Sequence, residues 1–198
     1  MYLKQETTNT IIIEKSRFIC YMKHIKSEEE FKEYLALIRK KHYDSDHVCS
    51  GFVSNNICRS SDDGEPSGTA GAPILNVLQK NNLNEMCAIV VRYFGGIKLG
   101  AGGLIRAYSS AVSETIANNH LYTDVSYPKY ELTLSYELGN KIKHFIENST
   151  ILLNTKYDTN ITYEFALDDK KKLEIINKFT KGISPIYVQD VEIETMVK

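Results

Sequence analysis

The most constraining feature of the sequence is an apolar run that leads through a glycine-rich loop into an amphipathic segment. The run Met86–Val91 is entirely apolar and rich in β-branched residues, which is typical of a central strand covered on both faces. Five of the eleven glycines follow between positions 95 and 103. Apolar residues at helical spacing from 104 to 116 then predict a helix. Asn118 and Asn119, which tolerate the left-handed conformation of a helix cap, mark its end.

The same segment is the locally electropositive part of the chain. No acidic residue lies between Glu85 and Glu114, whereas Arg92, Lys98 and Arg106 are basic. The whole sequence has 24 Lys and Arg against 25 Asp and Glu, a net charge of −1. This balance excludes the global positive field of a protein that coats nucleic acid or an anionic membrane. Any anion site is therefore local.

The glycine-rich loop has two interpretations, an anion site or a tight turn. A strand that ends in glycines and feeds a helix leaves free amides at the helix N-terminus, where the dipole favours an anion. Basic side chains can add hydrogen bonds to a phosphate, and aromatic ones, including Tyr108, can stack a base. The spacing matches neither a P-loop nor a dinucleotide-binding fingerprint, and a glycine-lined helix contact explains it equally well. The candidate anion-binding or nucleic-acid-binding residues are Arg92, Tyr93, Phe94, Gly95, Gly96, Lys98, Gly100, Gly102, Gly103 and Arg106.

An acidic loop precedes an apolar segment at 74–78 that is typical of a packed helix. Its polar side chains are Asp62, Asp63, Glu65, Ser67 and Thr69. Three carboxylates within four residues can hold Mg²⁺ or supply a general base beside a phosphate. A solvated turn with acids near a helix N-terminus explains them as well, and this interpretation is favoured.

The cysteines and histidines show no recognisable ligand spacing. Cys20, Cys49, Cys58 and Cys87 form no C-x-x-C pair, so we expect reduced, mostly structural thiols and no metal or cofactor. His47 and Cys49 share a face of a predicted strand, which makes a nucleophile pair or half a metal site conceivable. Neither Cys58 nor His42 completes such a site, so a buried cysteine and a hydrogen-bonded histidine are favoured.

The rest of the chain predicts two α+β domains. Ser27 and Glu30 have the spacing of a capping box that opens a helix, flanked by extended runs at Ile11–Met22 and His47–Ile57, the second turning at Ser54–Asn56. After Pro128 the pattern starts afresh and follows the β-α-β-β-α-β order of a ferredoxin-like domain. We therefore predict domains at residues 1–127 and 128–198.

Three stretches closely resemble the signature of the Impact/YigZ family. They are Ser61–Gly71 (SDDGEPSGTAG), Pro73–Leu75 (PIL) and Arg92–Tyr108 (RYFGGIKLGAGGLIRAY). Ser16–Ile19 and Ile38–His42 also resemble the amino-terminal elements of that family. One departure is Val48, where the family more often has a polar Asn, and it weakens any chemistry built on the neighbouring His47 and Cys49.

The resemblance implies a fold and a range of functions. It implies a first domain of the ribosomal-protein-S5-domain-2-like type, an α/β sandwich, and a ferredoxin-like second domain similar to one in translation elongation factor G. Eukaryotic Impact proteins regulate translation by binding a partner protein in the amino-acid starvation response. For bacterial members a nucleic-acid or ribosome-associated role is proposed, and no catalytic activity is established. Fold alone does not give function, so only the two matching loops are carried over, as a binding surface.

Three functions are compatible with these residues. The first is a translation-associated protein that binds RNA or a ribosomal component through the glycine-rich loop, and the second is a protein-interaction module with a regulatory partner. Both are favoured over the third, a Mg²⁺-dependent phosphate-handling enzyme, because no nucleophile, base and orienting group can be named together. The catalytic residues, the partner and the oligomeric state stay open. The longest apolar stretch is far too short to span a membrane, so we expect a cytoplasmic protein.

Overall fold

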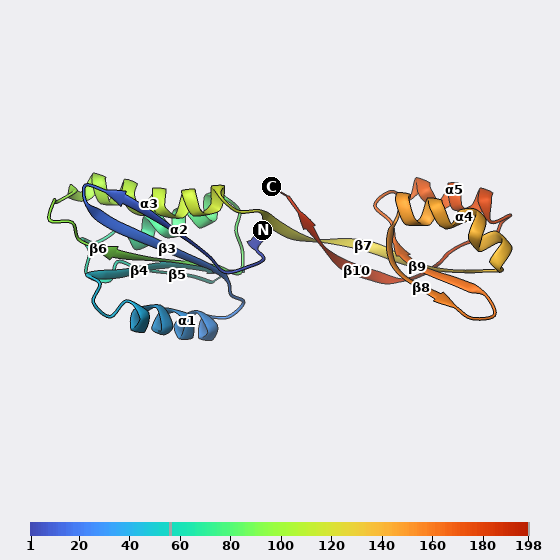
Figure 1. The fold of residues 1–198 in the computed structure, drawn as a ribbon, viewed down its shortest axis with the longest axis horizontal. Coiled ribbons are helices and arrows are strands. Elements are labelled where there is room, and N and C mark those ends of the chain that lie inside the picture. Colours follow the sequence, from blue (N-terminus) through green and yellow to red (C-terminus); the bar gives the residue numbers. More distant parts are fainter. Residues whose placement is uncertain (56, 198) are drawn as a thin grey trace. The chain divides into compact units, whose positions relative to one another are not determined.

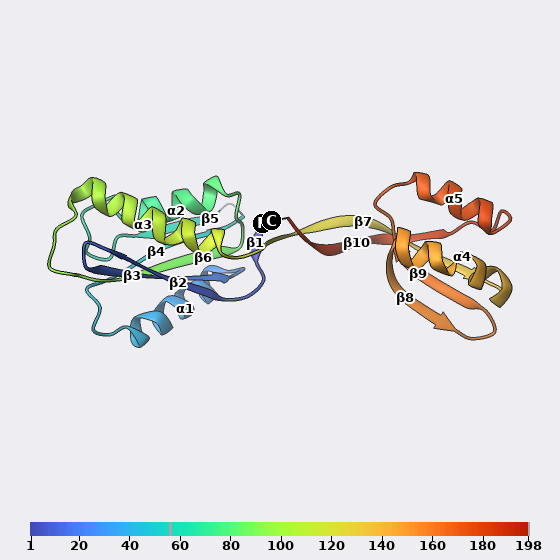
Figure 2. The ribbon, with the colours of Figure 1, turned by 45° about the horizontal axis from the view of Figure 1, so that its top comes forward.

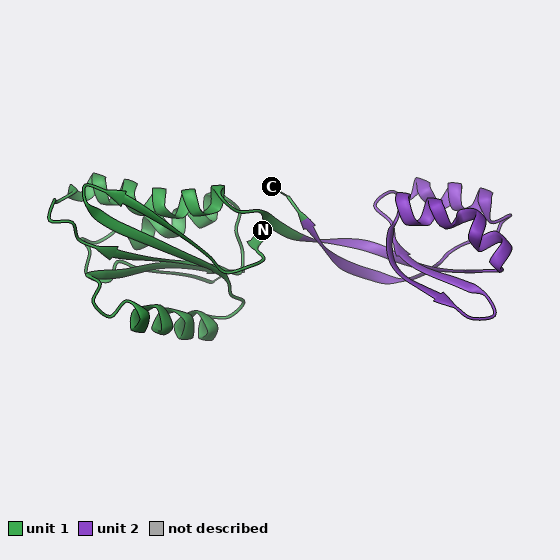
Figure 3. Cartoon of the chain, in the orientation of Figure 1, with its two compact units in different colours: residues 1–123, 196–198 green, residues 124–195 purple. Residues whose placement is uncertain are grey.

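The computed structural model describes residues 1–55 and 57–197, which form two compact units. Unit 1 comprises Met1–Thr123 with Met196–Lys198, and unit 2 comprises Asp124–Thr195 (Figure 3). The fold is mixed α/β, with two sheets among the described residues, as the sequence predicts. No helix in these residues is both long and apolar enough to cross a membrane.

Unit 1 is built on an antiparallel sheet with the apolar run at its centre. The strand order is β2-β3-β6-β4-β5. The strands are β2 (Thr7–Ile13), β3 (Ser16–His24), β4 (His47–Ser54), β5 (Ile57–Ser61) and β6 (Met86–Tyr93), and β1 (Tyr2–Leu3) pairs with the start of β7. Residues 86–92 of β6 are buried, which confirms the prediction of a central strand covered on both faces.

One β-hairpin precedes the first helix in the chain and another follows it. The predicted single run Ile11–Met22 is wrong in one respect, because it turns at Glu14 and Lys15, whose φ angles are 45° and 64°. Such turns favour Asn or Gly, so the sequence gives no signal there. The second hairpin turns through Asn55 (φ 51°), as predicted, while Asn56 lies outside the described residues.

Helices cover both faces of this sheet (Figures 1 and 2). The helix α1 (Glu28–Lys41) lies on one face, and α2 (Gly71–Lys80) and α3 (Gly100–Ala117) lie on the other. The Ser27 hydroxyl caps α1 by accepting a hydrogen bond from the Glu30 amide, as predicted. The predicted left-handed cap of α3 is wrong, since Asn118 has φ −85°. The Asn119 side chain instead donates to the Thr115 carbonyl and satisfies the last turn.

Unit 2 has the predicted ferredoxin-like order. Its strands are β7 (Leu121–Leu134, from Asp124 onward), β8 (Ile151–Tyr157), β9 (Ile161–Ala166) and β10 (Ile186–Met196), and its helices are α4 (Tyr136–Ser149) and α5 (Lys171–Phe179). The strand order is β10-β7-β9-β8. One apolar core joins these strands to the helices through residues such as Phe165, Ile142 and Ile176. The predicted boundary at Pro128 lies inside the long strand β7, which continues through it without a break.

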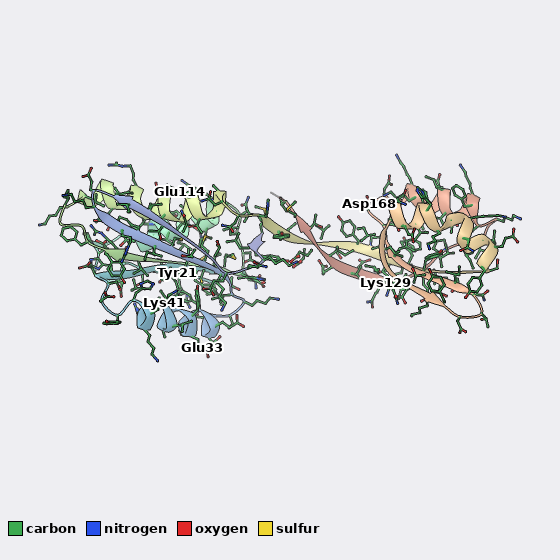
Figure 4. The ribbon with its side chains drawn as sticks, in the orientation of Figure 1. Tyr21, Glu33, Lys41, Glu114, Lys129 and Asp168 are labelled. Carbon is green, nitrogen blue, oxygen red and sulfur yellow. The ribbon has the colours of Figure 1, made fainter. Side chains whose placement is uncertain are left out.

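Acid should weaken unit 2 through one carboxylate on its sheet. Hydrogen bonds from Lys129 (labelled in Figure 4) and Lys156 lower the pKa of Glu164 to about 2. A depressed folded-state pKa stabilises the fold above the unfolded value of 4.5, and this contribution is lost as the pH falls towards 2. We expect Glu164→Gln to cost about 1 kcal/mol at neutral pH, and this cost to shrink as the pH falls below the unfolded value and to vanish below about 2. Thermal unfolding followed by circular dichroism across this pH range checks it. A deficit that does not change with pH would contradict it.

Candidate binding pocket between two loops

The two loops singled out by the sequence lie on one pocket of unit 1. The acidic loop (residues 62–70) connects β5 to α2, and the glycine loop (residues 94–99) connects β6 to α3. Together with the start of α3 they enclose a pocket of about 440 Å³, which we call the two-loop pocket. Its lining includes Glu65, Arg92, Phe94, Lys98 and Gly100. Residues far apart in the sequence are thus brought to one hollow of a size typical of small-ligand sites.

Glu65 and Arg92 form a buried ion pair at this pocket. The Arg92 Nη1 donates to Glu65 Oε1 at 2.6 Å, and the two side chains are 6% and 3% exposed. The Tyr108 hydroxyl donates to the same Oε1 at 2.8 Å. Arg92 was expected to bind an anion with its full charge, but Glu65 compensates that charge. Tyr108 is fully buried, so the expectation that it stacks a base is wrong.

The sequence contains one signal for this ion pair that the search for motifs missed, namely a charged residue in an apolar strand. Arg92 directly follows the apolar run Met86–Val91 in β6, and a buried arginine requires a carboxylate partner. The window around it holds no acid, so the partner had to come from elsewhere in the chain. Which carboxylate supplies it depends on how the acidic loop folds over the sheet.

The Asp62 carboxylate organises the acidic loop. Its two oxygens accept hydrogen bonds from the amides of Gly68, Ala70 and Gly71, at 2.8 to 3.0 Å. Burial raises the pKa of Asp62, but these three amides outweigh burial and hold it below its ordinary value. Asp62 therefore stabilises the entry into α2, where the backbone would otherwise lack partners.

The other polar groups of the acidic loop point to separate partners. Asp63 accepts from the Arg39 guanidinium and from the Val48 amide, each at 2.7 Å. Thr69 is buried and donates to the Pro66 carbonyl, while Ser67 is exposed. Within residues 1–55 and 57–197, no three His, Cys, Asp or Glu side chains are placed to hold a metal ion. In this part of the chain, the acidic loop therefore does not form a set of Mg²⁺ ligands.

His47 presents an open ring nitrogen at the pocket. Its Nδ1 lies 2.8 Å from the Asp63 carbonyl, which can only accept, so Nδ1 carries the proton. In the neutral imidazole, Nε2 is then an acceptor, and it lies 3.9 Å from Glu65 Oε2. Both atoms belong to residues that line the two-loop pocket.

Cys49 is a structural thiol. It is fully buried, and its S–H has two acceptors in reach, the Asp62 carbonyl at 2.9 Å and the Tyr108 hydroxyl at 3.3 Å. Burial raises the pKa of the Cys49 thiol to about 12. The thiolate needed for nucleophilic chemistry is therefore scarce at neutral pH, which favours the interpretation of a buried cysteine.

The glycines of the second loop serve two purposes. A Cβ at Gly95 would lie 2.1 Å from the Lys15 carbonyl carbon, so this glycine permits close packing of the loop on the β2–β3 hairpin. Gly100 has φ +68° and starts α3 at the pocket wall. Gly96 lies in the loop, and Gly102 and Gly103 lie in the first turn of α3. The tight-turn interpretation holds for Gly95, and Gly100 forms part of the pocket.

Comparison with known proteins assigns both loops to one family domain. The model of the Impact N-terminal domain matches residues 14–116, which include the acidic loop, the glycine loop and α3. The chain belongs to the Impact family. The Impact family member YvyE of Bacillus subtilis is 39% identical over 93% of this chain and 88% of its own length. YigZ of Escherichia coli is 33% identical over 86% and 88%. A solved structure of a hypothetical protein, 29% identical, covers 95% of both chains with a TM-score of 0.59.

A second hollow adjoins the two-loop pocket on this Impact domain. It measures about 410 Å³ and shares Lys98 and Leu99 with the first. Arg106 and Glu14 also line it. The basic residues Lys98 and Arg106, both singled out by the sequence, therefore line this second hollow, and Lys98 lines both.

The two aromatic residues of the Impact motif have different surroundings. Phe94 is 45% exposed and lines the two-loop pocket. Tyr93 lies outside it and donates to Asp44, with its ring 4.4 Å from the Arg17 guanidinium. Its hydroxyl also contacts His42, which is hydrogen-bonded to Tyr21 (labelled in Figure 4). Of the two rings, Phe94 is the one available to a ligand in the pocket.

Proposed function

We propose that this Impact protein is a non-catalytic binding protein of translation or its regulation, which binds a single strand of RNA in the two-loop pocket and the adjoining hollow. The observation that carries the proposal is the start of α3. No side chain caps this helix and its first turn contains no acid. Its amides and dipole therefore favour an anion such as a phosphate at the wall formed by Gly100 and Ala101.

The charges around the pocket support an anionic ligand of limited size. Lys98 borders both hollows and Arg106 borders the second, while the Glu65 charge is offset by Arg92. Two further acids, Asp46 in the first lining and Glu14 in the second, limit the positive charge, and the Asp46 carboxylate accepts from the Phe94 amide. Two neighbouring hollows suit a strand rather than an isolated anion. Phe94 offers a face on which a base can stack, and such stacking tolerates any sequence.

Family membership supports the setting in translation. Eukaryotic Impact proteins are regulators of translation, and the chain shares their N-terminal domain. A protein partner is the second candidate, and exposed apolar residues at the same place favour it. Phe94, Ile97 and Ile105 are 38–45% exposed on the glycine loop and α3. Binding to a protein through such residues would be insensitive to salt, in contrast to binding through phosphates.

Removing the two basic residues should weaken RNA binding strongly. We expect the anisotropy of labelled oligouridine to report salt-dependent binding with a log–log slope near −2, corresponding to roughly three phosphates. Lys98→Ala combined with Arg106→Ala should weaken binding by at least about tenfold, because each residue removes a phosphate contact.

The control is Lys40→Ala, next to Lys41 (labelled in Figure 4) on α1, a helix that covers the face of the sheet opposite α3 (Figure 1). It removes one exposed positive charge from the same unit and should leave affinity nearly unchanged. Absence of binding at low salt would overturn the RNA proposal, and so would equal losses in the control and the double variant.

A further inference from the structure

We propose that the two-loop pocket holds one ribonucleotide of the bound strand, and that Glu65 Oε2 and His47 Nε2 accept a hydrogen bond from its 2′-hydroxyl. The protein would then select RNA over DNA. This inference rests on the proposed function and names the residues that decide its specificity.

The first observation is an unused acceptor on a buried side chain. Glu65 is 3% exposed, and its Oε1 accepts from both Arg92 and Tyr108. Among the described residues no hydrogen bond to its Oε2 is found, and His47 Nε2 lies 3.9 Å from this oxygen. A carboxylate oxygen at a pocket wall without a donor costs free energy unless water or a ligand supplies one.

The second observation is the fixed orientation of His47. The Asp63 carbonyl accepts a hydrogen bond from Nδ1, so in the neutral imidazole Nε2 is an acceptor, 3.9 Å from Glu65 Oε2. Val48 does not disturb this arrangement, because its side chain is buried in the opposite core and only its amide contacts Asp63. Glu65 Oε2 and His47 Nε2 are thus two neighbouring acceptors in the pocket lining that a donor group of a ligand could satisfy.

Because Arg92 already offsets the Glu65 charge, a neutral donor at Oε2 is favoured over a second ion. A second cation at Glu65 Oε2 would approach the Arg92 guanidinium, which already lies 2.6 Å from Oε1. An anion there would meet the carboxylate itself. A neutral donor is repelled by neither, and in a nucleic acid the 2′-hydroxyl is the neutral donor that RNA has and DNA lacks.

The remaining groups suit the other parts of the same nucleotide. Lys98 and the open amides of α3 suit its phosphate, and Phe94 suits its base. The Arg92 Nε is buried and has no hydrogen-bond partner among the described residues. Donors at the glycine loop and at the start of α3 thus accompany acceptors on the acidic loop and β4, an arrangement that suits a nucleotide.

Three labelled strands of equal length test this assignment. Oligouridine, oligodeoxyuridine and 2′-O-methyl oligouridine share their bases and phosphates, and the methylated strand keeps the 2′-oxygen but loses its proton. We expect oligouridine to bind about tenfold tighter than either of the others, since hydrogen bonds to charged groups are worth about that factor. His47→Phe should reduce this preference, because it lowers the affinity for oligouridine more than the affinity for oligodeoxyuridine. Glu65→Gln, checked for folding by circular dichroism, should reduce it further.

The outcomes separate this inference from the proposed function. Equal affinity of the wild type for the three strands, still lost on removal of Lys98 and Arg106, would overturn the role of the 2′-hydroxyl and retain the RNA proposal. A His47→Phe variant that loses affinity for all strands equally would overturn the acceptor role. No binding to any strand would overturn both.

Discussion

Replacing Arg92 with methionine should destabilise unit 1 by about 3–5 kcal/mol. The Arg92 guanidinium is 6% exposed, lies between the rings of Phe18 and Phe94, and donates to the nearly inaccessible Glu65 carboxylate. Methionine fills much of the same volume but leaves Glu65 as a buried charge with one hydroxyl donor. Breaking a buried pair from one side costs this much because the remaining charge loses its compensation.

The expected destabilisation comes from breaking the buried Glu65–Arg92 pair, and the loss of an exposed arginine should not reproduce it. In Arg39→Met the lost contact is also an arginine–carboxylate bond of 2.7 Å, to Asp63, but this arginine is 47% exposed. Solvent screens such a pair, so the expected cost is at most about 1 kcal/mol. Denaturant unfolding of both variants measures the contrast. Similar costs for the two would show that Glu65 tolerates the loss of its partner.

The double variant Glu65→Gln/Arg92→Met separates charge from packing. The glutamine side chain that replaces Glu65 still offers an oxygen to the Tyr108 hydroxyl while carrying no charge. Replacing both members of a buried pair is usually far milder than removing one. We therefore expect the double variant to be more stable than Arg92→Met alone, which a double-mutant cycle reports directly.

The sequence predicted elements more completely than it predicted contacts. β6 and α3 follow from the apolar run, the glycines and the helical periodicity, because these signals are local. The Glu65–Arg92 pair spans 27 residues and depends on the path of the acidic loop, which no local pattern encodes. The turn at Glu14 and Lys15 was missed for a different reason. Both residues adopt positive φ although neither is of a type that prefers it, so the sequence carries no signal for this turn.

The two loops illustrate how far motif analysis reaches. The Impact resemblance placed Asp62, Glu65 and Lys98 in one signature, and the fold gathers the two loops at one pocket. The resemblance did not show that these residues have different roles. Asp62 faces backbone amides and stabilises its own loop, whereas Glu65 lines the pocket with one oxygen unused. Neighbouring acids differ in function because the chain turns between them, and this turn is visible only in three dimensions.

A single methyl group on Gly95 should be among the most damaging substitutions in the chain. The added Cβ would lie 2.1 Å from the Lys15 carbonyl carbon and 2.3 Å from the Ser16 nitrogen, both backbone atoms. Real Cβ atoms do not approach so closely, so the glycine loop or the β2–β3 hairpin must move. We expect Gly95→Ala to cost about 3 kcal/mol and to weaken RNA binding as the loop shifts.

Gly102→Ala is the matched control within the same motif. Its added Cβ would meet only the flexible tip of Arg106, at 3.5 Å, and alanine favours the helix more than glycine does. We expect its free energy of unfolding to equal or exceed that of the wild type. Denaturant unfolding compares the two alanines directly. If both cost the same, the glycines would serve the flexibility of the loop, whereas a loss confined to Gly95→Ala assigns this glycine to packing against the β2–β3 hairpin.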